Sequence, residues 1–352
     1  MKKKVLFFLQ SGVGGAERVT VTIAKYLDTT KFEVKFCIVD RPLGKTTIDV
    51  FIPAQYSKVR IPNVKGLKQL RALYGVLRCE KPDFVFSSIM HTNTKLLALS
   101  VFFPKIKFIV RNNNYVYTLS KKQKFILKYT YCMADVVVAQ TEEMKDELIR
   151  EMNVPEGKIK VLQNPIDVDT IDSMVAHPSP YEENGKIRYV ASGRFVPAKG
   201  FDVLIRAFDL VKREQADSEL FIVGNIDGVC SEYYGSIKKL VRELGLDESV
   251  HCLGFQKNPY IYIKNADCFV LSSRNEGLPN VLIEALYLGI PVAATKCIPV
   301  ILRIVDDTKN GFLAESEDPE SLAEAMLKAS KLGRITSRYQ SACCIDFQNL
   351  FE

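Results

Sequence analysis

The stretch RNEGLPNVLIEA, Arg274 to Ala285, places two acidic side chains on either side of a short turn. Glu276 comes before the turn residues Gly277 and Pro279, and seven residues separate it from Glu284. We expect a helix to follow the turn, so that both carboxylates can face one site. A loop carboxylate can accept the hydroxyls of a sugar, and a helix carboxylate can accept the two hydroxyls of a ribose.

The start of this expected helix offers a third binding group. The helix begins at Pro279 or Asn280, just after Leu278, and the first amides of a helix have no partner within it. Such amides bind phosphate oxygens, so the stretch has the groups that a nucleotide-sugar needs. Alternatively, Glu276 is an ordinary acidic residue of a loop, and Glu284 is an ordinary acidic residue near the start of a helix.

A second candidate loop, SGRFVPAKGFDVLI, runs from Ser192 to Ile205. Arg194 follows an expected strand, and Lys199 lies just before the next expected helix. Two cations five residues apart around a proline-bearing turn can clamp a diphosphate. The alternative is a pair of solvated surface cations.

The first glycine loop, QSGVGGAER, follows the first expected strand. The dinucleotide pattern G-x-G-x-x-G would need a third glycine where this sequence has Glu17, so the nicotinamide interpretation is weak. A Walker A loop is also absent, because no G-K-[ST] follows. Gly14 and Gly15 remain as a turn whose amides can approach a phosphate, or simply as a tight strand-to-helix turn.

These loops fit a repeated pattern of strands and helices. Apolar runs such as KVLFFL, VKFCIV and KFIVR alternate with amphipathic stretches, and after Asn164 the pattern starts again with IRYVASG, LFIVGN and CFVLSS. Strands that are apolar on both faces and alternate with helices predict a parallel sheet covered on both sides. The sequence therefore predicts two doubly wound α/β domains joined near QNPIDVD, residues 163–169, and ligands of such sheets bind after the strands.

Composition and charge limit the possible partners. The 352 residues are 47% hydrophobic and 25% charged, as in an ordinary globular protein, and no apolar run is long enough to cross a membrane. Nine cysteines without metal-like spacing are expected to be reduced core residues, and three dispersed histidines predict no zinc site. Residues 1–165 hold 28 Lys and Arg against 14 Asp and Glu, a net charge of +14, whereas the remainder carries −7. The first half is therefore expected to meet something anionic, such as phospholipid headgroups, a pyrophosphate-linked acceptor or nucleic acid.

The motifs GGAER, NPID, GRFVPAKG, ADCFVLSS and EGLPNVLIE occur in this order along the chain. Together they resemble the retaining glycosyltransferases of family 4, especially those that build bacterial surface polysaccharides on lipid carriers. The resemblance implies the GT-B fold, two Rossmann-like, doubly wound parallel-sheet domains facing a central cleft. We expect an acceptor-binding domain at 1–164, a nucleotide-sugar domain at 165–335, and a C-terminal helix at 336–352 that packs back on the first domain.

The resemblance also implies roles by position. Arg194 and Lys199 would stabilise the donor diphosphate, Glu276 would hold the transferred sugar, and Glu284 would hold the ribose. The implied donor-binding residues are Gly14, Gly15, Arg194, Lys199, Glu276, Gly277, Leu278, Pro279, Asn280 and Glu284.

The acceptor side departs from the family pattern. Many relatives have a histidine near the reacting carbon, but the corresponding segment here, FIVRNNNYV, has none. His91, in SSIMHTNT, is the substitute candidate, and a structural role is the alternative. The implied catalytic residues are Glu276, Arg194, Lys199 and His91, and the acceptor-side candidates are Glu17, His91, Arg111 and Asn113.

The expected reaction moves a hexose or N-acetylhexosamine from a nucleotide-diphosphate sugar to a glycan hydroxyl with retention of configuration. No enzymatic nucleophile is evident, so front-face attack assisted by the departing phosphate is favoured. The family does not generally use a metal for this step, so neither a metal nor another cofactor is expected. Uridine-diphosphate sugars come first by family frequency.

A basic helix in the first half suggests where this happens. The segment LSKKQKFILKYTYCMAD, residues 119–135, places lysines on one side and aromatic residues on another. Such a helix can lie on an anionic membrane, although it can also be a solvated helix packed on its sheet. The basic first half favours membrane docking, a lipid-pyrophosphate-linked acceptor and a peripheral location on the cytoplasmic face of the plasma membrane. Nucleic-acid binding is not expected, because no recognition module is present.

Two rival functions remain. A nucleotide-sugar epimerase of the same fold would need no lipid acceptor and would consume donor alone. A non-catalytic binding protein would have no need of Arg194, Lys199, Glu276 and Glu284 together.

Overall fold

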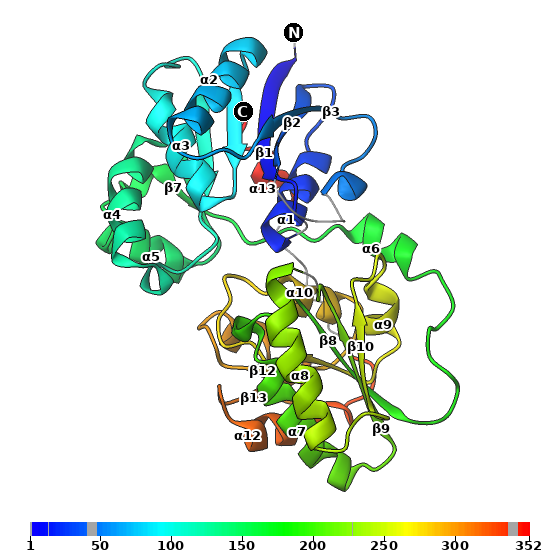
Figure 1. The fold of residues 1–352 in the computed structure, drawn as a ribbon. Coiled ribbons are helices and arrows are strands. Elements are labelled where there is room, and N and C mark those ends of the chain that lie inside the picture. The colour runs from blue at the N-terminus through cyan, green and yellow to red at the C-terminus, as the bar shows by residue number, and fades with distance from the viewer. Residues whose placement is uncertain (1, 13, 41–47, 227, 337–343) are drawn as a thin grey trace. The chain divides into compact units, whose positions relative to one another are not determined.

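The computed structural model describes residues 2–12, 14–40, 48–226, 228–336 and 344–352. They form two compact units, each built on a parallel sheet with helices around it (Figure 1). The first unit is Met1–Pro165 with Ser341–Glu352, and the second is Ile166–Gln340. The predicted pair of Rossmann-like α/β domains is therefore confirmed, while the central cleft between them stays a prediction.

The first unit contains a seven-stranded sheet in the order β3-β2-β1-β4-β5-β6-β7, with every described pairing parallel. Its strands are β1 (Lys3–Gln10), β2 (Phe32–Asp40), β3 (Ser57–Pro62), β4 (Phe84–Ser87), β5 (Lys107–Arg111), β6 (Val136–Ala139) and β7 (Ile159–Val161). Its helices are α1 (Gly15–Lys25), α2 (Leu67–Glu80), α3 (Met90–Ser100), α4 (Lys121–Thr130), α5 (Glu142–Arg150) and α13 (Cys344–Gln348).

Strand β1 is central because its residues are apolar on both faces. The five residues from Val5 to Leu9 are each at most 1% exposed. A strand buried on both sides belongs in the middle of a parallel sheet with helices on each face. Burial on both faces therefore fixes β1 as the strand from which the sheet extends in two directions.

The end of the chain completes the core of this unit. Phe347, Leu350 and Phe351 are buried in the same cluster as the inward residues of β1 and β2. The ring of Phe351 lies 5.9 Å from that of Phe7 and 5.6 Å from that of Phe84. The part of the expected tail that the structure describes, 344–352, thus packs on the first unit.

The second unit contains a six-stranded parallel sheet in the order β10-β9-β8-β11-β12-β13. Its strands are β8 (Ile187–Ser192), β9 (Ser218–Val223), β10 (Val250–Gly254), β11 (Cys268–Leu271), β12 (Val292–Thr295) and β13 (Gly311–Ala314). Its helices are α6 (Val168–Met174), α7 (Phe201–Glu214), α8 (Ser231–Glu243), α9 (Tyr260–Lys264), α10 (Asn280–Tyr287), α11 (Ile301–Ile304) and α12 (Pro319–Ala329).

Each sheet reverses its strand order at one place. In the first unit β1 lies beside β4, and in the second β8 lies beside β11, so the chain extends the sheet outward on both sides of these pairs. A crevice opens at the carboxyl ends of strands at such a switch point, and ligands bind there. The loops after β1, β4, β8 and β11 are therefore where function is expected.

Candidate functional site

Two loops of the second unit, 193–200 after β8 and 272–279 after β11, lie against each other. The backbone amide of Arg274 donates to Ala198 O at 2.9 Å, and Ser272 Oγ donates to Lys199 O at 2.9 Å. Gly200 has φ +61°, and a side chain there would collide with the carbonyl of Ser272. A glycine is needed at this position for both reasons, the positive φ and the close approach.

The contact between these loops brings two predicted site residues together. Lys199 Nζ lies 2.5 Å from Glu276 Oε1, and Ser273 Oγ donates to the same oxygen at 2.7 Å. Both charged side chains are largely buried, at 20% and 12% exposed. Because the two groups are close together and partly shielded from water, the ion pair holds both side chains in one orientation. Their charges are thereby positioned to bind a charged ligand.

Arg194, the other predicted cation, is placed differently. It lies two residues after the end of β8 and is exposed. Its guanidinium has no hydrogen-bond or ion-pair partner among the described residues, so its charge is available to a ligand. The structure therefore places Arg194 on the same loop as Lys199 but does not bring it into the Lys199–Glu276 pair.

The start of α10 provides amides and a second acid, as the sequence suggests. Within the described residues, the amides of Gly277 and Leu278 have no acceptor, and the helix begins just after Pro279. Glu284 is 7% exposed, and Tyr260 Oη donates to its Oε1 at 3.1 Å. Tyr260 comes from α9, so it adds a site residue that the motif did not reveal.

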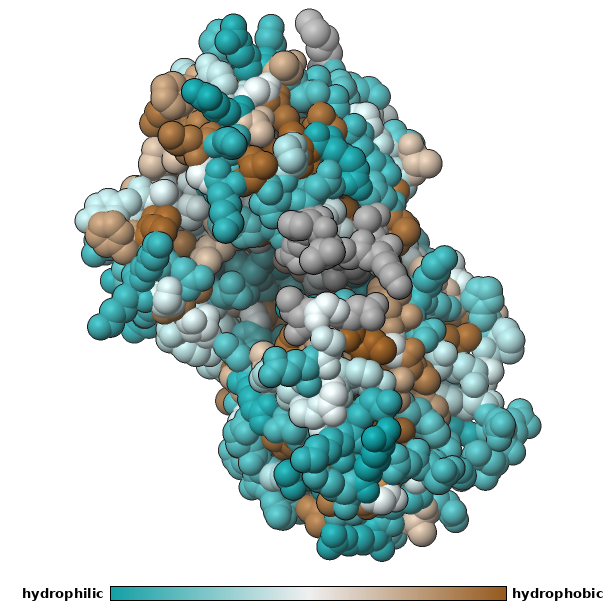
Figure 2. Space-filling view, viewed as in Figure 1, coloured by the Kyte–Doolittle hydropathy of each residue, from teal (hydrophilic) through white to brown (hydrophobic). Residues whose placement is uncertain are grey.

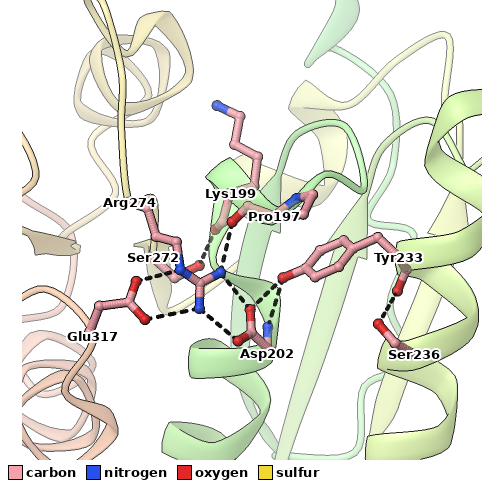
Figure 3. A network of polar contacts seen from close by, with 8 residues as sticks. All are labelled: Pro197, Lys199, Asp202, Tyr233, Ser236, Ser272, Arg274 and Glu317. Carbon is pink, nitrogen blue, oxygen red and sulfur yellow. Dashed lines mark hydrogen bonds and ion pairs between the residues drawn. The ribbon is translucent and has the colours of Figure 1, made fainter. Parts of the chain in front are cut away.

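Arg274 ties the two loops to the rest of the unit. Its guanidinium donates to Pro197 O at 2.7 Å and to both carboxylate oxygens of Asp202 at 2.7 and 2.8 Å. It also pairs with Glu317, which follows β13, and Figure 3 shows the guanidinium lying between the two carboxylates. Tyr233 of α8 donates to Asp202 from the other side. One side chain thus links four segments of the unit.

The charges in this network stabilise one another. Burial alone would raise the pKa of Asp202, but the hydrogen bonds from Arg274 and Tyr233 outweigh it and hold the pKa at about 2. The hydrogen bond to Asp202 in turn raises the pKa of Arg274. Burial, followed by the hydrogen bond to Asp202, raises the pKa of Tyr233 to about 12. Asp202, Arg274 and Tyr233 each keep one protonation state around neutral pH, so their contacts act as a fixed support.

In the first unit, the first glycine loop opens α1. Gly14 is the residue before α1 and Gly15 its first residue. Glu17 is only 6% exposed, and a side chain at Gly14 would collide with its carboxylate. A side chain at position 14 would therefore require the Glu17 carboxylate to move.

His91 begins α3 near the carboxyl end of β4. Its Nε2 contacts the side-chain amide of Gln10, which ends β1 and is 2% exposed. The ring itself is exposed. His91 thus lies beside the β1–β4 switch point, where a ligand of this unit is expected.

Arg111 and Asn113 form a buried cluster at the end of β5. Arg111 is 1% exposed; it donates to Asn113 Oδ1 at 2.6 Å and to the side-chain oxygen of Asn164. Gln140 donates to the same Asn113 oxygen at 3.0 Å, and Asn113 Nδ2 donates to Ser88 O. Asn113 is therefore held at both ends of its amide, and Arg111 acts through it.

This cluster contains unsatisfied polar atoms. Ser87 Oγ, Asn93 Oδ1, Arg111 Nε and Gln140 Oε1 are buried without a partner among the described residues. The described acceptors of Arg111 are neutral amide oxygens, and burial lowers its pKa to about 9, so it remains charged at neutral pH. Buried polar atoms without partners are rare, so they indicate a place for water or for a polar ligand.

Comparison with known families assigns the whole chain. The family described as glycosyl transferases group 1 matches residues 176–342, and the family described as glycosyltransferase family 4 matches residues 13–170. Each match covers most of one unit. The chain belongs to these glycosyltransferase families. The resemblance read from the motifs is thereby confirmed.

Individual relatives agree with this assignment. The glycosyltransferase is 26% identical over 94% of its length, and 92% of the relative's, to an N-acetylgalactosaminyltransferase of Campylobacter jejuni that acts on a diphospho-undecaprenol substrate. It is 23% identical, over 90% of its own length and 85% of the relative's, to an Escherichia coli UDP-Gal:GlcNAc-diphosphoundecaprenol galactosyltransferase. It is 32% identical to an uncharacterized glycosyltransferase of Methanocaldococcus jannaschii, over 66% of its own length and 60% of the relative's.

Solved structures agree on the fold. Anabaena HepE, in complex with UDP and glucose, matches with a TM-score of 0.80 and 19% identity, over 99% of this chain and 98% of that one. The lipopolysaccharide outer core galactosyltransferase WaaB, in its apo form, matches with a TM-score of 0.66 and 18% identity, over 95% of this chain and 92% of that one. The GT-B fold of the glycosyltransferase is therefore confirmed.

Two cysteines do not lie where the sequence predicted them. Cys79 and Cys132 of the glycosyltransferase are exposed, so the prediction that the cysteines are core residues is wrong for these two. In the segment that joins the units, Asp167 caps α6 by accepting from the Thr170 amide at 3.2 Å. In the described part of the chain, no group of three or more His, Cys, Asp or Glu is arranged for a metal, and no helix is long and apolar enough to cross a membrane.

Proposed function

We propose that this glycosyltransferase moves a hexose or N-acetylhexosamine from a nucleotide-diphosphate sugar to a hydroxyl of a lipid-pyrophosphate-linked glycan, with retention of configuration. The observation that carries the donor half is the Lys199–Glu276 pair at the β8–β11 switch point, 2.5 Å apart and beside the unpaired amides of Gly277 and Leu278. The curated relatives in Campylobacter and Escherichia, which act on diphospho-undecaprenol substrates, support the acceptor half.

In the proposed reaction the bond between the sugar C1 and the diphosphate oxygen breaks, and its electron pair stays on the phosphate. Lys199 and the exposed Arg194 meet this negative charge, and the amides before α10 bind the phosphate oxygens. Glu276 holds the hydroxyls of the sugar while positive character develops on the ring, and Glu284 holds the ribose. The acceptor oxygen forms the new bond on the same face, and its proton passes to the departing phosphate.

On the acceptor side we assign His91 and Asn113 to the region near the attacking hydroxyl. Asn113 is fixed at both ends of its amide, and His91 lies against Gln10, so both are held in place before a ligand arrives. Arg111 positions Asn113, and its buried charge favours a nearby phosphate. Glu17 and Gly14 support the glycine loop that approaches the donor phosphate.

We further propose that the enzyme works at the cytoplasmic face of the plasma membrane as a peripheral protein, without a metal or other cofactor. The acceptor of the proposed reaction is anchored in a bilayer, so the enzyme has to reach a membrane surface. The net charge of +14 on residues 1–165 supports the binding of an anionic surface by the first unit.

The assignment of the charge pair is tested by two substitutions. We expect Lys199→Ala and Glu276→Ala each to lower turnover by at least about a hundredfold, the usual scale for the loss of one charge-stabilising group. Lys328→Ala is the matched control, because it removes a lysine that is paired with Glu324 at 2.6 Å on the exposed face of α12. Near-normal turnover in either site variant would remove that residue from the mechanism.

The donor is identified by a panel of nucleotide-sugars, with uridine-diphosphate sugars first. Each is scored by the shift in melting temperature and by slow hydrolysis in the absence of acceptor. A donor that binds and is hydrolysed supports transferase chemistry, and an acceptor-linked product of unchanged anomeric configuration supports retention. Release of an epimer without acceptor would identify an epimerase, and a failure of every donor to bind would favour a non-catalytic protein.

A further inference from the structure

Exposed apolar side chains are concentrated on one side of the first unit. In the described residues, eleven large apolar side chains are exposed, and eight of them lie between residues 67 and 129. We call these eight the docking face. They are Leu67, Tyr74, Val101, Phe102, Tyr117, Phe125, Ile126 and Tyr129.

Helix α4 provides three of the eight side chains, Phe125, Ile126 and Tyr129. Phe125 and Tyr129 are 64% and 61% exposed, and their ring centroids lie 4.8 Å apart. Only Leu127 of this helix is buried. A helix that simply covers its sheet buries its aromatic residues, so this arrangement argues against the ordinary packing interpretation. The two rings instead form a pair that points away from the core.

A second group lies at the end of α3 and on α2. Val101 and Phe102 are 62% and 65% exposed, and the ring of Phe102 lies 6.1 Å from that of Tyr74 on α2. Helix α3 packs against both α2 and α4, so the two groups lie on neighbouring helices of the unit. Figure 2 shows brown side chains among teal ones along this side, where Figure 1 draws α2, α3 and α4.

The segments that carry the face are strongly basic, although Lys124 of α4 pairs with Glu151, which follows α5, at 2.9 Å. Residues 64–133 contain thirteen Lys and Arg but only two acids, Glu80 and Asp83. Both acids have partners on β1 or β2: Glu80 pairs with Lys35 of β2 at 2.7 Å and lies 3.7 Å from Lys4 of β1, and Asp83 accepts the Lys4 amide at 2.7 Å. Lys121, Lys122 and Lys128 of α4 are exposed beside the aromatic pair.

We propose that the docking face binds an anionic phospholipid bilayer, with its apolar side chains in the headgroup boundary and its lysines on lipid phosphates. Exposed apolar side chains together with exposed lysines are complementary to such a membrane. Nucleic acid would leave the aliphatic residues Leu67, Val101 and Ile126 unused. This inference rests on the proposed lipid-linked acceptor and adds the surface that would reach it.

The test is co-sedimentation of the full chain with vesicles, which requires neither donor nor acceptor. We expect binding to phosphatidylcholine vesicles with about 30% phosphatidylglycerol, and little binding to pure phosphatidylcholine or at high salt. The paired variants Phe125→Ser with Tyr129→Ser, and Val101→Ser with Phe102→Ser, should each weaken binding about tenfold or more. Leu302→Ser is the matched control, since Leu302 is 51% exposed but belongs to the second unit.

A charge variant tests the same surface without touching its apolar residues. Replacing Lys121, Lys122 and Lys128 together by Gln should weaken binding by at least about fivefold per lysine at low salt. The proposal would be overturned if the wild-type protein did not bind anionic vesicles, or if the paired variants bound them as tightly as the wild type does. The proposal would also be overturned if the protein formed a dimer without lipid and the aromatic variants were monomers. A second copy of the chain would then cover the face.

The two hypotheses can fail separately. If vesicle binding fails while a soluble acceptor analogue still receives sugar, the docking face is wrong and the transferase proposal stands. If the protein binds vesicles through these residues but transfers no sugar, the opposite holds.

Discussion

Arg274 has the contacts of a positioning residue for the charge pair. It bonds to Pro197 O, Asp202 and Glu317, and so keeps the loop that carries Lys199 against the loop that carries Glu276. We expect Arg274→Gln to lower kcat/KM about tenfold to a hundredfold, because small displacements of reacting groups are costly. Steady-state kinetics with the identified donor measures this effect.

Lysine at the same position separates geometry from charge. A lysine is a point charge and cannot bond three acceptors in the planar fork that arginine provides. Arg274→Lys should therefore be nearly as impaired as Arg274→Gln, whereas full rescue by lysine would mean that charge alone matters. Arg213→Gln is the control, since it removes an exposed arginine that pairs only along its own helix, with Asp209.

The Asp202–Arg274 contact also predicts a dependence of stability on pH. The pKa of Asp202 falls from the ordinary 3.8 to about 2 on folding, so its ionised form stabilises the fold above about pH 4, and this contribution disappears as the pH falls toward 2. The difference in free energy of unfolding between wild type and Asp202→Asn should therefore shrink over that range. Urea unfolding at several pH values checks it, and a difference independent of pH would contradict it.

Residues close in sequence were predictable at this scale, and distant partners were not. The spacing of Glu276, its turn and Glu284 indicated a sugar and a nucleotide, because one loop and one helix hold them all. Arg274 gave no such signal, since what matters is a partner brought close by the fold, Asp202, which is 72 positions away. The sequence likewise could not show that Lys199 faces Glu276 while Arg194 does not.

At the level of elements, the entry to α7 depends on one glycine. Gly200 has φ +61°, and a methyl group there would strike the carbonyl of Ser272. We expect Gly200→Ala to reduce the free energy of unfolding by about 2–4 kcal/mol, from backbone strain and overpacking together. Thermal or urea unfolding measures the loss.

Gly245→Ala separates the two causes. Gly245 has φ +66° but nothing within 4 Å of an added side chain. It should therefore show only the backbone cost, about 1 kcal/mol. Equal losses in the two variants would mean that the approach of the two loops is not tight.

The central strands were predictable, and so were the edge strands β7 and β10, but the other two edge strands were not. Strands such as β1 and β11 are continuous apolar runs, so their burial shows in the sequence. The edge strands β3 and β13 were missed because β3, SKVRIP, is mostly exposed and polar, and β13 has four residues beginning with a glycine. Helix α6 was missed for a similar reason, since only Ile171 of its residues is buried.

For the whole molecule, the two units should respond differently to a change in the tail. Phe351 is fully buried among Phe7, Phe84 and Phe86. Phe351→Ala should destabilise the first unit by about 3–5 kcal/mol, the usual cost of emptying such a site. Hydrogen exchange should speed up in β1 and β4 but not in β8 and β9, and an equal change in both units would contradict this division of the chain.

The repeated alternation of strands and helices and the uneven distribution of charge could be recognised from the sequence, because each is a property of a long stretch of the chain. Two runs of alternating strands and helices predicted two sheets, and the net charge of +14 on residues 1–165 indicated which half meets an anionic partner. The orientation of the aromatic side chains on α4 needed the fold, since the same pattern fits a helix that buries them.

The position of the tail has a consequence for how the protein is made. Residues 344–352 complete the core of the first unit, yet they are synthesised after the whole of the second. During translation, the phenylalanine side chains of the first unit that the tail covers therefore stay exposed until the tail has been synthesised. Chaperones can bind them during that time. A premature stop codon that removes this tail would therefore destabilise the first unit more than the second, although the second is closer to it in the sequence.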